Sequence, residues 1–232
     1  MELGDEEDAE RWIDRAVELS PDSGFSNSAL ASLRMHQGNE TEAILYTKRA
    51  LREETFSSYW RRLGVLRNAD LRDERYKDAR ERYEQYLPEL FDDDPTIDGT
   101  NYLAAIDLAL VMKLTIEPMR AEELLNGSFD YIQTIPRLGW EGYGIADVHI
   151  FALQGKTDAA FAAFQQAIDQ GWRPIGQYPL DRDPNLAALR EEPAFQAILD
   201  ELEADMSAQL ERVTAMDRAG ELDPLPELAA TP

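Results

Sequence analysis

The sequence predicts an all-α protein: an α-solenoid of helix hairpins that ends in a long C-terminal capping helix. Two observations predict it. A pattern of small and bulky residues recurs along the chain, with 34 residues from Ala9 to Ala43 and 36 from Ala43 to Ala79. Residues 193–218 then carry apolar side chains at helical spacing on one stripe. Internal repeats of this length are typical of stacked helical units.

The repeated pattern places small residues at constant intervals. Each copy has a Gly, an Ala five residues later, a bulky residue four further on and a second Ala three beyond that. Small residues let two helices approach closely, and Gly suits a tight turn with positive φ. The clear copies are Gly4, Ala9, Ile13 and Ala16; Gly38, Ala43, Thr47 and Ala50; and Gly155, Ala160, Phe164 and Ala167. A partial copy has Ala79 and Tyr83, with Tyr86 at the second Ala position, and a degenerate copy surrounds Ala121.

The segment Trp60-Arg-Arg-Leu63-Gly64 resembles the W-x-x-L-G opening of the tetratricopeptide repeat, and Leu30-Ala31 matches it in part. The resemblance implies pairs of antiparallel helices stacked into a right-handed solenoid. The chain opens on a second helix, residues 5–19. The expected pairs are 25–37 with 40–53, 57–70 with 74–87, 99–114 with 118–134, and 141–154 with 157–170. We expect an insertion at Arg72 in the second pair, and an interruption at Asn126-Gly127 in the third, which also lacks the turn Gly.

The region after Trp172 departs from the repeat. We divide the chain into an array at 1–172 (a half repeat, two regular pairs, one degenerate pair and one regular pair), an extended linker with a capping helix at 173–220, and a disordered tail at 221–232. Asp183-Pro184 and Glu192-Pro193 each suit a helix start with Pro in the first turn. Residues 180–195 are similar to the closing segment of tetratricopeptide arrays that follow bacterial winged-helix regulators or class III nucleotide cyclases. This resemblance implies an effector domain ahead of Met1.

The charge balance bears on the partner. The chain has 46 acidic and 23 basic residues, a formal charge of −23, and no Cys. A nucleic-acid partner is disfavoured because phosphates need a surplus of Lys and Arg. No membrane contact is expected, and no apolar run approaches the roughly 20 residues that cross a bilayer. A protein or peptide partner remains. No secretory signal is visible, but this does not fix the compartment. We expect the cytoplasm, or the periplasm if the chain belongs to a membrane-anchored protein.

Candidate chemistry is sparse, and we expect a non-enzyme without cofactor or metal. Residues 92–103 begin as a calcium loop but have Ile97 and Leu103 where that loop needs Gly and Glu. The glycines at 139, 142 and 144 stand in the wrong order for a dinucleotide loop and predict a loop before a helix. Neighbouring carboxylates such as Glu53-Glu54 and Glu122-Glu123 are expected to face water, and we find no nucleophile motif.

The first helix of each pair lines the concave side of such arrays, so its exposed positions are the candidate peptide-binding residues. The resemblance places there Phe25, Ser28, Ser32, Met35, Arg61, Val65, Asn68, Tyr102 and His149. The Lys and Asn that grip a peptide carboxylate in one branch of the family are absent from these positions. For each residue, packing within the fold is the alternative, and we expect His149 to be a satisfied helix residue.

Three functions follow. The first is a non-catalytic scaffold that binds a partner peptide or helix in the groove. The second is a regulatory C-terminal module of a larger bacterial signalling protein. The third, an enzyme, rests only on scattered carboxylates. The apolar stripe from Met206 to Met216 extends beyond the expected docking partner of its helix and predicts a homodimer contact.

Overall fold

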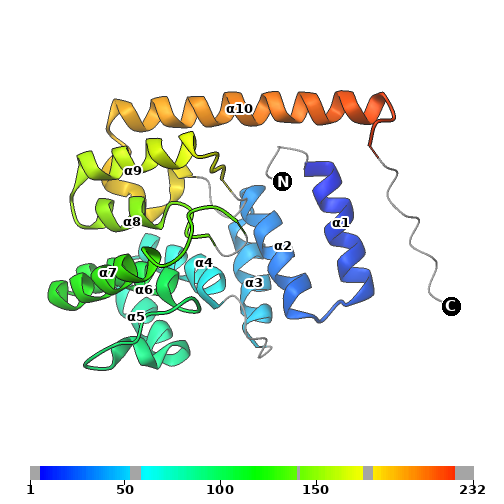
Figure 1. Ribbon diagram of the computed structural model, residues 1–232. Helices are drawn as coiled ribbons and strands as arrows, with labels where there is room; N and C mark the ends of the chain where they lie inside the picture. The colour runs from blue at the N-terminus through cyan, green and yellow to red at the C-terminus, as the bar shows by residue number, and fades with distance from the viewer. Residues whose placement is uncertain (1–5, 53–58, 140–141, 175–179, 223–232) are drawn as a thin grey trace.

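The computed structural model describes residues 6–52, 59–139, 142–174 and 180–222, and these contain helices and no strand. An all-α protein was predicted, and the described residues confirm it (Figure 1). The α-helices are α1 (Glu6–Leu19), α2 (Gly24–His36), α3 (Glu40–Ala50), α4 (Tyr59–Arg72), α5 (Tyr76–Tyr86), α6 (Tyr102–Leu114), α7 (Pro118–Ile132), α8 (Ala146–Leu153), α9 (Thr157–Asp169) and α10 (Pro193–Arg218). Three short 3-10 helices are η1 (Pro88–Phe91), η2 (Leu180–Arg182) and η3 (Pro184–Leu189).

Local sequence signals set several helix starts. The Ser23 hydroxyl accepts hydrogen bonds from the backbone N–H groups of Phe25 and Ser26 at the start of α2. The Asn39 side chain does the same for Glu42 in α3. These contacts satisfy N–H groups that have no partner within the helix. Proline occupies the first turn of η3 and α10, as the sequence predicted.

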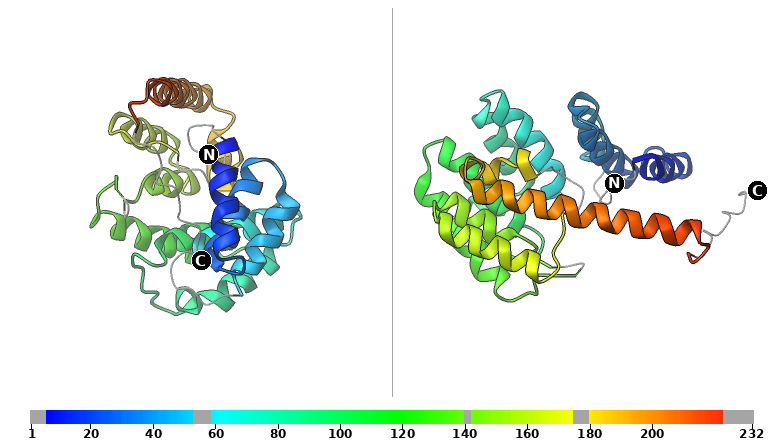
Figure 2. Two further views of the ribbon diagram at one scale, coloured as in Figure 1. Left: turned by 90° about the vertical axis from the view of Figure 1, so that its right-hand side faces the viewer. Right: turned by 90° about the horizontal axis from the view of Figure 1, so that it is seen from above.

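Consecutive helices pair into four hairpins: α2 with α3, α4 with α5, α6 with α7, and α8 with α9 (Figures 1 and 2). The turns are Gln37–Asn39, Asp73–Arg75, Thr115–Glu117 and Gln154–Lys156, and their middle residues are Gly38, Glu74, Ile116 and Gly155. All four middle residues have positive φ, between 57° and 74°. One backbone hydrogen bond closes each turn, from the N–H after the middle residue to the carbonyl five positions earlier, with lengths of 2.7 to 2.9 Å. The hairpins therefore share one turn conformation.

This shared turn corrects two sequence interpretations. The expected insertion at Arg72 is not in the turn, since α4 and α5 are joined by the same three-residue connection as the other pairs. The third pair lacks Gly, yet Ile116 adopts the left-handed conformation that Gly holds at positions 38 and 155. The hairpins therefore keep the same turn conformation even where the turn Gly is absent.

The repeat positions are buried alike in every hairpin. The residues five positions after the turn centre are Ala43, Ala79, Ala121 and Ala160, and each has 0% exposure. The residues nine positions after it are Thr47, Tyr83, Leu125 and Phe164, all at 1% or less. The degenerate unit around Ala121 therefore packs as the regular ones do. The four alanines are the small residues that the sequence analysis expected to allow close helix approach, and the bulkier residues four positions later fill the remaining space.

The expected interruption at Asn126-Gly127 is wrong, because α7 runs unbroken from Pro118 to Ile132. Position 127 has no room for a side chain, because a Cβ there would lie 2.9 Å from Cγ1 of Ile97. The loop before α6 packs against the helix at that point. Gly127 therefore allows the loop residue Ile97 to approach α7 closely and does not interrupt the helix.

The stretch after Trp172 was expected to be extended, but it contains η2 and η3 within its described part. The apolar side chains of η3 and of the first half of α10 share one core with α8 and α9; they are Leu186, Leu189, Phe195, Ile198 and Leu202. The closing segment therefore packs on α8 and α9, the last hairpin. The expected disordered tail at 221–232 lies, from 223 onward, outside the described residues.

Helix α10 begins against α9 and continues past it toward the side of the molecule that carries α1 (Figures 1 and 2). The proposed dimer contact lies on this second half. Val213 is 40% exposed there, whereas Met206, Leu210 and Met216 are half-buried. Within the described part of the chain, no helix combines the length and the apolar character needed to span a membrane.

Candidate functional site

The candidate groove residues lie on α2, α4, α6 and α8, the first helices of the four hairpins. Helix α4 contacts α6, and α6 contacts α8. These three helices therefore form a continuous face, and α2 adjoins it through α3, which packs on α4.

The α2 end of this face presents one large apolar side chain and two hydroxyls. Phe25 is 64% exposed. Ser28 is half-buried, donates its hydroxyl to the Gly24 carbonyl over 2.7 Å and accepts from Nε of Arg62 over 3.0 Å. Ser32 is also half-buried and donates to the Ser28 carbonyl over 3.1 Å. Phe25 can therefore contact a ligand, while Ser28 ties α2 to α4.

Two of the candidates face inward, which corrects their assignment to an open groove. Met35 is 4% exposed and Tyr102 is 7% exposed. The ring of Tyr102 lies 5.2 Å from that of Tyr131 on the partner helix α7. Burial and the neighbouring Tyr131 raise the pKa of Tyr102 to about 12. Both side chains lie on the face of their helix that packs against the fold.

Helix α4 carries three of the candidates, of which two have described side chains. Val65 and Asn68 are half-buried, and the Asn68 side-chain oxygen accepts from Nε of the neighbouring Arg67 over 2.8 Å. The side chain of Arg61, the expected polar anchor of the groove, lies outside the described residues.

The remaining candidate, His149, belongs to a group of buried polar side chains that we call the central polar cluster. It contains one residue from each of α4, α5, α6 and α8 and two from the start of η3: Arg67, Tyr83, Asp107, His149, Asp183 and Asn185. Only His149 among them was predicted from the sequence as a site residue. The cluster joins the closing segment to the middle of the array.

One half of the cluster is centred on Asp107. Its carboxylate pairs with the guanidinium of Arg67. It also accepts a hydrogen bond from Nδ2 of Asn185 over 2.8 Å and one from the Tyr83 hydroxyl over 3.4 Å. Arg67 in turn donates to Oδ1 of Asn185 over 3.2 Å. A buried charge needs both an opposite charge and hydrogen bonds, and Asp107 has both.

The other half is the pair between His149 and Asp183. Nε2 of His149 lies 3.2 Å from Oδ2 of Asp183, which is ion-pair distance without the alignment of a hydrogen bond. The second Asp183 oxygen caps η3 by accepting the Asn185 backbone N–H over 2.9 Å. His149 was expected to be a satisfied helix residue, and its Nε2 is paired with the carboxylate of Asp183 on the closing segment.

Burial and the neighbouring charges move the pKa values of the cluster. Burial raises the pKa of Asp107 above its ordinary value, against the pull of Arg67. Burial opposes ionisation of Asp183 as well, but the positive His149 outweighs it and lowers the pKa of Asp183 to about 2. Burial alone would lower the pKa of His149, yet the negative charge of Asp183 raises it above the usual value. The cluster therefore favours two opposite-charge pairs.

The cluster is nearly closed to solvent. The side chain of Arg67 is 4% exposed, and those of Asp107, His149 and Asp183 are 12%, 15% and 16% exposed. A ligand on the first-helix face could reach only the edges of these groups. Their geometry serves to fix η3 against α4, α6 and α8, and it fills that part of the face with the chain's own side chains.

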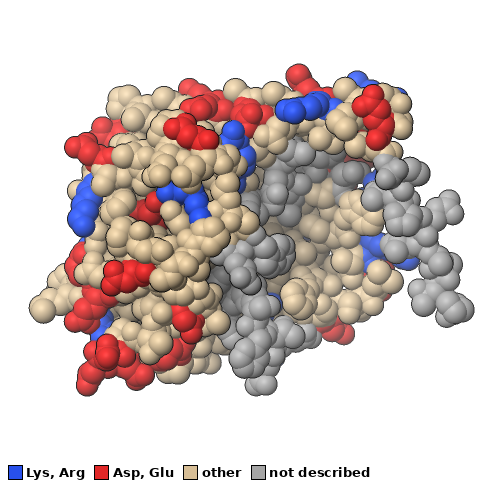
Figure 3. Space-filling view, in the orientation of Figure 1, with Lys and Arg blue, Asp and Glu red and all other residues tan. Residues whose placement is uncertain are grey.

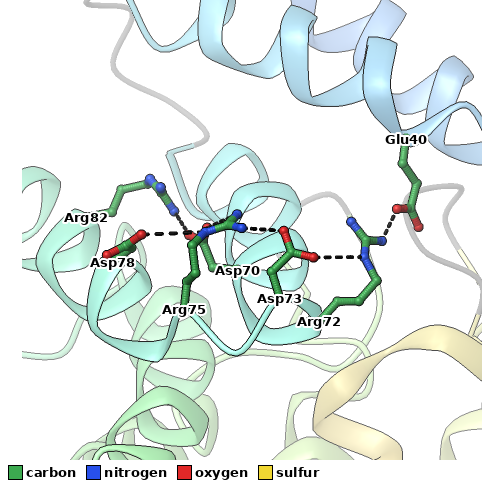
Figure 4. A network of polar contacts seen from close by, with 7 residues as sticks. All are labelled: Glu40, Asp70, Arg72, Asp73, Arg75, Asp78 and Arg82. Atoms are coloured by element: carbon green, nitrogen blue, oxygen red, sulfur yellow. Dashed lines mark hydrogen bonds and ion pairs between the residues drawn. The ribbon is translucent and has the colours of Figure 1, made fainter.

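A second ion-pair network lies at the turn between α4 and α5 (Figure 4). Asp70 has a side-chain exposure of 4% and pairs with both Arg75 and Arg82. The more exposed members extend the network to α3 and along α5; they are Glu40, Arg72, Asp73 and Asp78. These contacts brace the hairpin turn and do not form a ligand pocket.

The two loops that we considered for ligands serve local structure. In the acidic stretch at 92–98, Oδ1 of Asp98 accepts hydrogen bonds from the backbone and hydroxyl of Thr100, so it closes a turn before α6. In the glycine cluster, a Cβ on Gly142 would lie 2.4 Å from the Arg137 carbonyl oxygen, so this loop before α8 requires Gly there. Among the described residues, no group of three His, Cys, Asp or Glu side chains could hold a metal ion.

We compared the chain with protein-family models, curated proteins and solved structures, and none of them matches it. Function must therefore be argued from the chain's own geometry.

The cluster residues missed from the sequence had one readable signal. Asp107 interrupts the apolar run from Leu103 to Met112, whose other side chains are buried or half-buried, and a charge at such a position implies a buried partner. Its partners could not be found by spacing. Arg67 and Asn185 stand 118 residues apart, and only the packed fold brings them together.

Proposed function

We propose that this chain is a non-catalytic interaction scaffold of the tetratricopeptide type, a right-handed solenoid whose first-helix face binds a segment of a partner protein. The observation that carries the proposal is the shared hairpin. Four hairpins use one turn conformation and bury the same repeat positions, although two of them lack the turn Gly. Stacked units of this kind provide long curved docking surfaces.

Two features of the first-helix face support a narrower assignment of the partner segment. The central polar cluster occupies the face between α4 and α8 with Asp183 and Asn185 of the closing segment. The α2 end carries the exposed Phe25 beside the half-buried Ser28 and Ser32. An aromatic side chain at a binding face supplies a large, rigid contact area at low entropic cost. We therefore assign the partner segment to α2 and the adjoining part of α4.

Selection of a random peptide library on the immobilised chain tests this assignment. A selected peptide, made synthetically, should bind the chain in titration calorimetry. Phe25→Ala should weaken that binding on the order of tenfold, about 1.4 kcal/mol. Leu45→Ala is the matched control, because Leu45 is 48% exposed on the second helix α3 and lies off the proposed face. Equal binding by the Phe25→Ala chain would place the contact elsewhere.

A second function follows from the closing segment. Asn185 and Asp183 fix η3 on the array, and Leu186, Leu189 and Phe195 complete its last core. A segment that covers the end of an array is what a terminal module needs. On this basis the chain would be the regulatory C-terminal part of a larger bacterial signalling protein. The transcript upstream of the Met1 codon decides this: a continuous frame that encodes a winged-helix or cyclase domain supports it, and a stop codon there excludes it.

The homodimer through the second half of α10 remains a prediction. Light scattering at high protein concentration tests it, and a monomer mass under those conditions would remove it.

A further inference from the structure

The turn between α6 and α7 exposes a set of apolar side chains that we call the turn patch: Leu114, Ile116 and Met119. Their exposed fractions are 41%, 88% and 81%. Leu114 ends α6, Ile116 is the turn centre and Met119 lies in the first turn of α7. Single exposed apolar residues are ordinary, but here three occur within six residues at one turn.

Ile116 is also in an unfavourable backbone conformation. Its φ of 66° is left-handed, which costs an L-residue about 1–2 kcal/mol, and a β-branched side chain is especially rare there. The equivalent turns at positions 38 and 155 have Gly, which adopts this conformation without strain. Glu74, at the remaining equivalent position, also has positive φ, but its exposed side chain is polar. Ile116 alone combines strain with an exposed apolar side chain among these four turns.

Burial of the Ile116 side chain does not offset this cost, since a side chain that is 88% exposed gains little from burial. A strained residue at an exposed position is typical of a binding surface. The offset would come from burial against another molecule.

The charges around the turn patch indicate what that molecule is. The neighbouring cations are each paired within the chain: Lys113 with Glu122, Arg120 with Glu123, and Arg80 with Glu117 and Glu84. Arg120 also donates to the backbone carbonyl of Asp92, so the exposed acidic run of Asp92, Asp93 and Asp94 lies close to this helix. Acidic atoms gather over the part of the surface that carries α5 and α7 (Figure 3).

We propose that the turn patch is a second docking surface, separate from the first-helix face, and that it takes a basic amphipathic segment of a partner protein. Apolar side chains of the partner cover Ile116 and Met119, and its flanking Lys or Arg side chains face the acidic surroundings. This combination uses burial for affinity and charge for orientation and on-rate.

A synthetic Leu/Lys amphipathic peptide of about five helical turns, roughly 18 residues, is the probe. Fluorescence anisotropy should show that it binds the full chain, and that a Leu/Glu peptide of the same pattern does not. The Ile116→Gly/Met119→Ser variant should bind the Leu/Lys peptide on the order of tenfold more weakly. The same variant should unfold at no lower urea concentration than the parent chain, because Gly relieves the strained turn.

Leu45→Ser is the matched control, since it removes an exposed apolar side chain of 48% exposure from α3 and should leave the peptide affinity unchanged. Equal binding of the Leu/Lys peptide by the parent chain and the double variant would overturn the proposal, because it would show attraction to the acidic surface in general. No binding by the parent chain would overturn it as well. Phe25→Ala, which tests the first-helix face, should not affect this probe, so the two proposals can fail independently.

Discussion

The side-chain amide of Asn185 donates a hydrogen bond to the carboxylate of Asp107 over 2.8 Å, across 78 residues of sequence. The same amide group accepts from Arg67, so one residue of the closing segment serves both members of a buried ion pair. The C-terminal segment is thereby fixed to the second and third hairpins, beyond the last hairpin that precedes it in the chain. This contact fills part of the first-helix face with the chain's own side chains.

Asn185→Ala should destabilise the chain by about 1–3 kcal/mol, because it leaves the buried Asp107 and Arg67 each without one hydrogen-bond partner. Urea unfolding followed by circular dichroism measures the change. Gln85→Ala, at an exposed position of α5, is the control and should lie within about 0.5 kcal/mol of the parent chain. A cost for Asn185→Ala no larger than the control's would show that the cluster is not tightly packed.

The coupling between His149 and Asp183 should depend on pH. The folded pKa of His149 lies above its ordinary value of 6.5, so the stability from its protonated form is complete below that value and is lost as pH rises through the folded pKa. Asp183 has a folded pKa of about 2, so it stays ionised over the pH range in which His149 loses its proton. The other charged groups that face His149 are Asp107 and Arg67.

A double-mutant cycle with His149→Gln and Asp183→Asn isolates this pair. We expect a coupling energy above about 0.5 kcal/mol near pH 5 that shrinks near pH 8.5. Asparagine at position 183 can still cap η3, so the cycle reports on charge and not on the lost cap. A coupling energy that is the same at both pH values would contradict the ion pair.

In the ion-pair network at the turn between α4 and α5, removal of two different carboxylate partners of Arg75 should lower the free energy of unfolding by unequal amounts. Arg75 pairs with Asp70, whose side chain is 4% exposed, and with Asp78, whose side chain is 57% exposed. Asp70→Ala should cost about 1–3 kcal/mol, since it removes a buried acceptor shared by Arg75 and Arg82. Asp78→Ala should cost at most about 0.5 kcal/mol. Chemical denaturation of both variants checks this, and equal costs would argue against a buried role for Asp70.

The shared turn predicts a backbone effect that contacts cannot explain. A Cβ added at Gly38 or Gly155 would meet nothing within 4 Å, yet both glycines have positive φ. Gly38→Ala and Gly155→Ala should therefore each destabilise the chain by about 1 kcal/mol through strain alone. Thermal unfolding of the two variants measures it. Unchanged midpoints would mean that these turns relax to another conformation at little cost.

The sequence predicted much of the fold for a physical reason. Helix spacing, Ala positions and turn glycines are local signals, and they located all four hairpins to within a few residues. The third hairpin was expected to be degenerate because it lacks the turn Gly and contains Asn126-Gly127, but its turn has the shared positive φ, and Ala121 and Leu125 are buried like the equivalent residues of the other hairpins. The central polar cluster was mostly missed, since its contacts, such as Arg67 with Asn185, join residues whose spacing carries no periodic signal.

Hydrogen exchange of the chain with and without a library-selected peptide tests the central claim most directly. If the first-helix face is the docking surface, amide protection should rise in α2, around Phe25, and in the first half of α4. It should change little in α9 and α10. Protection confined to other helices, or none at a saturating peptide concentration, would contradict the scaffold that we propose.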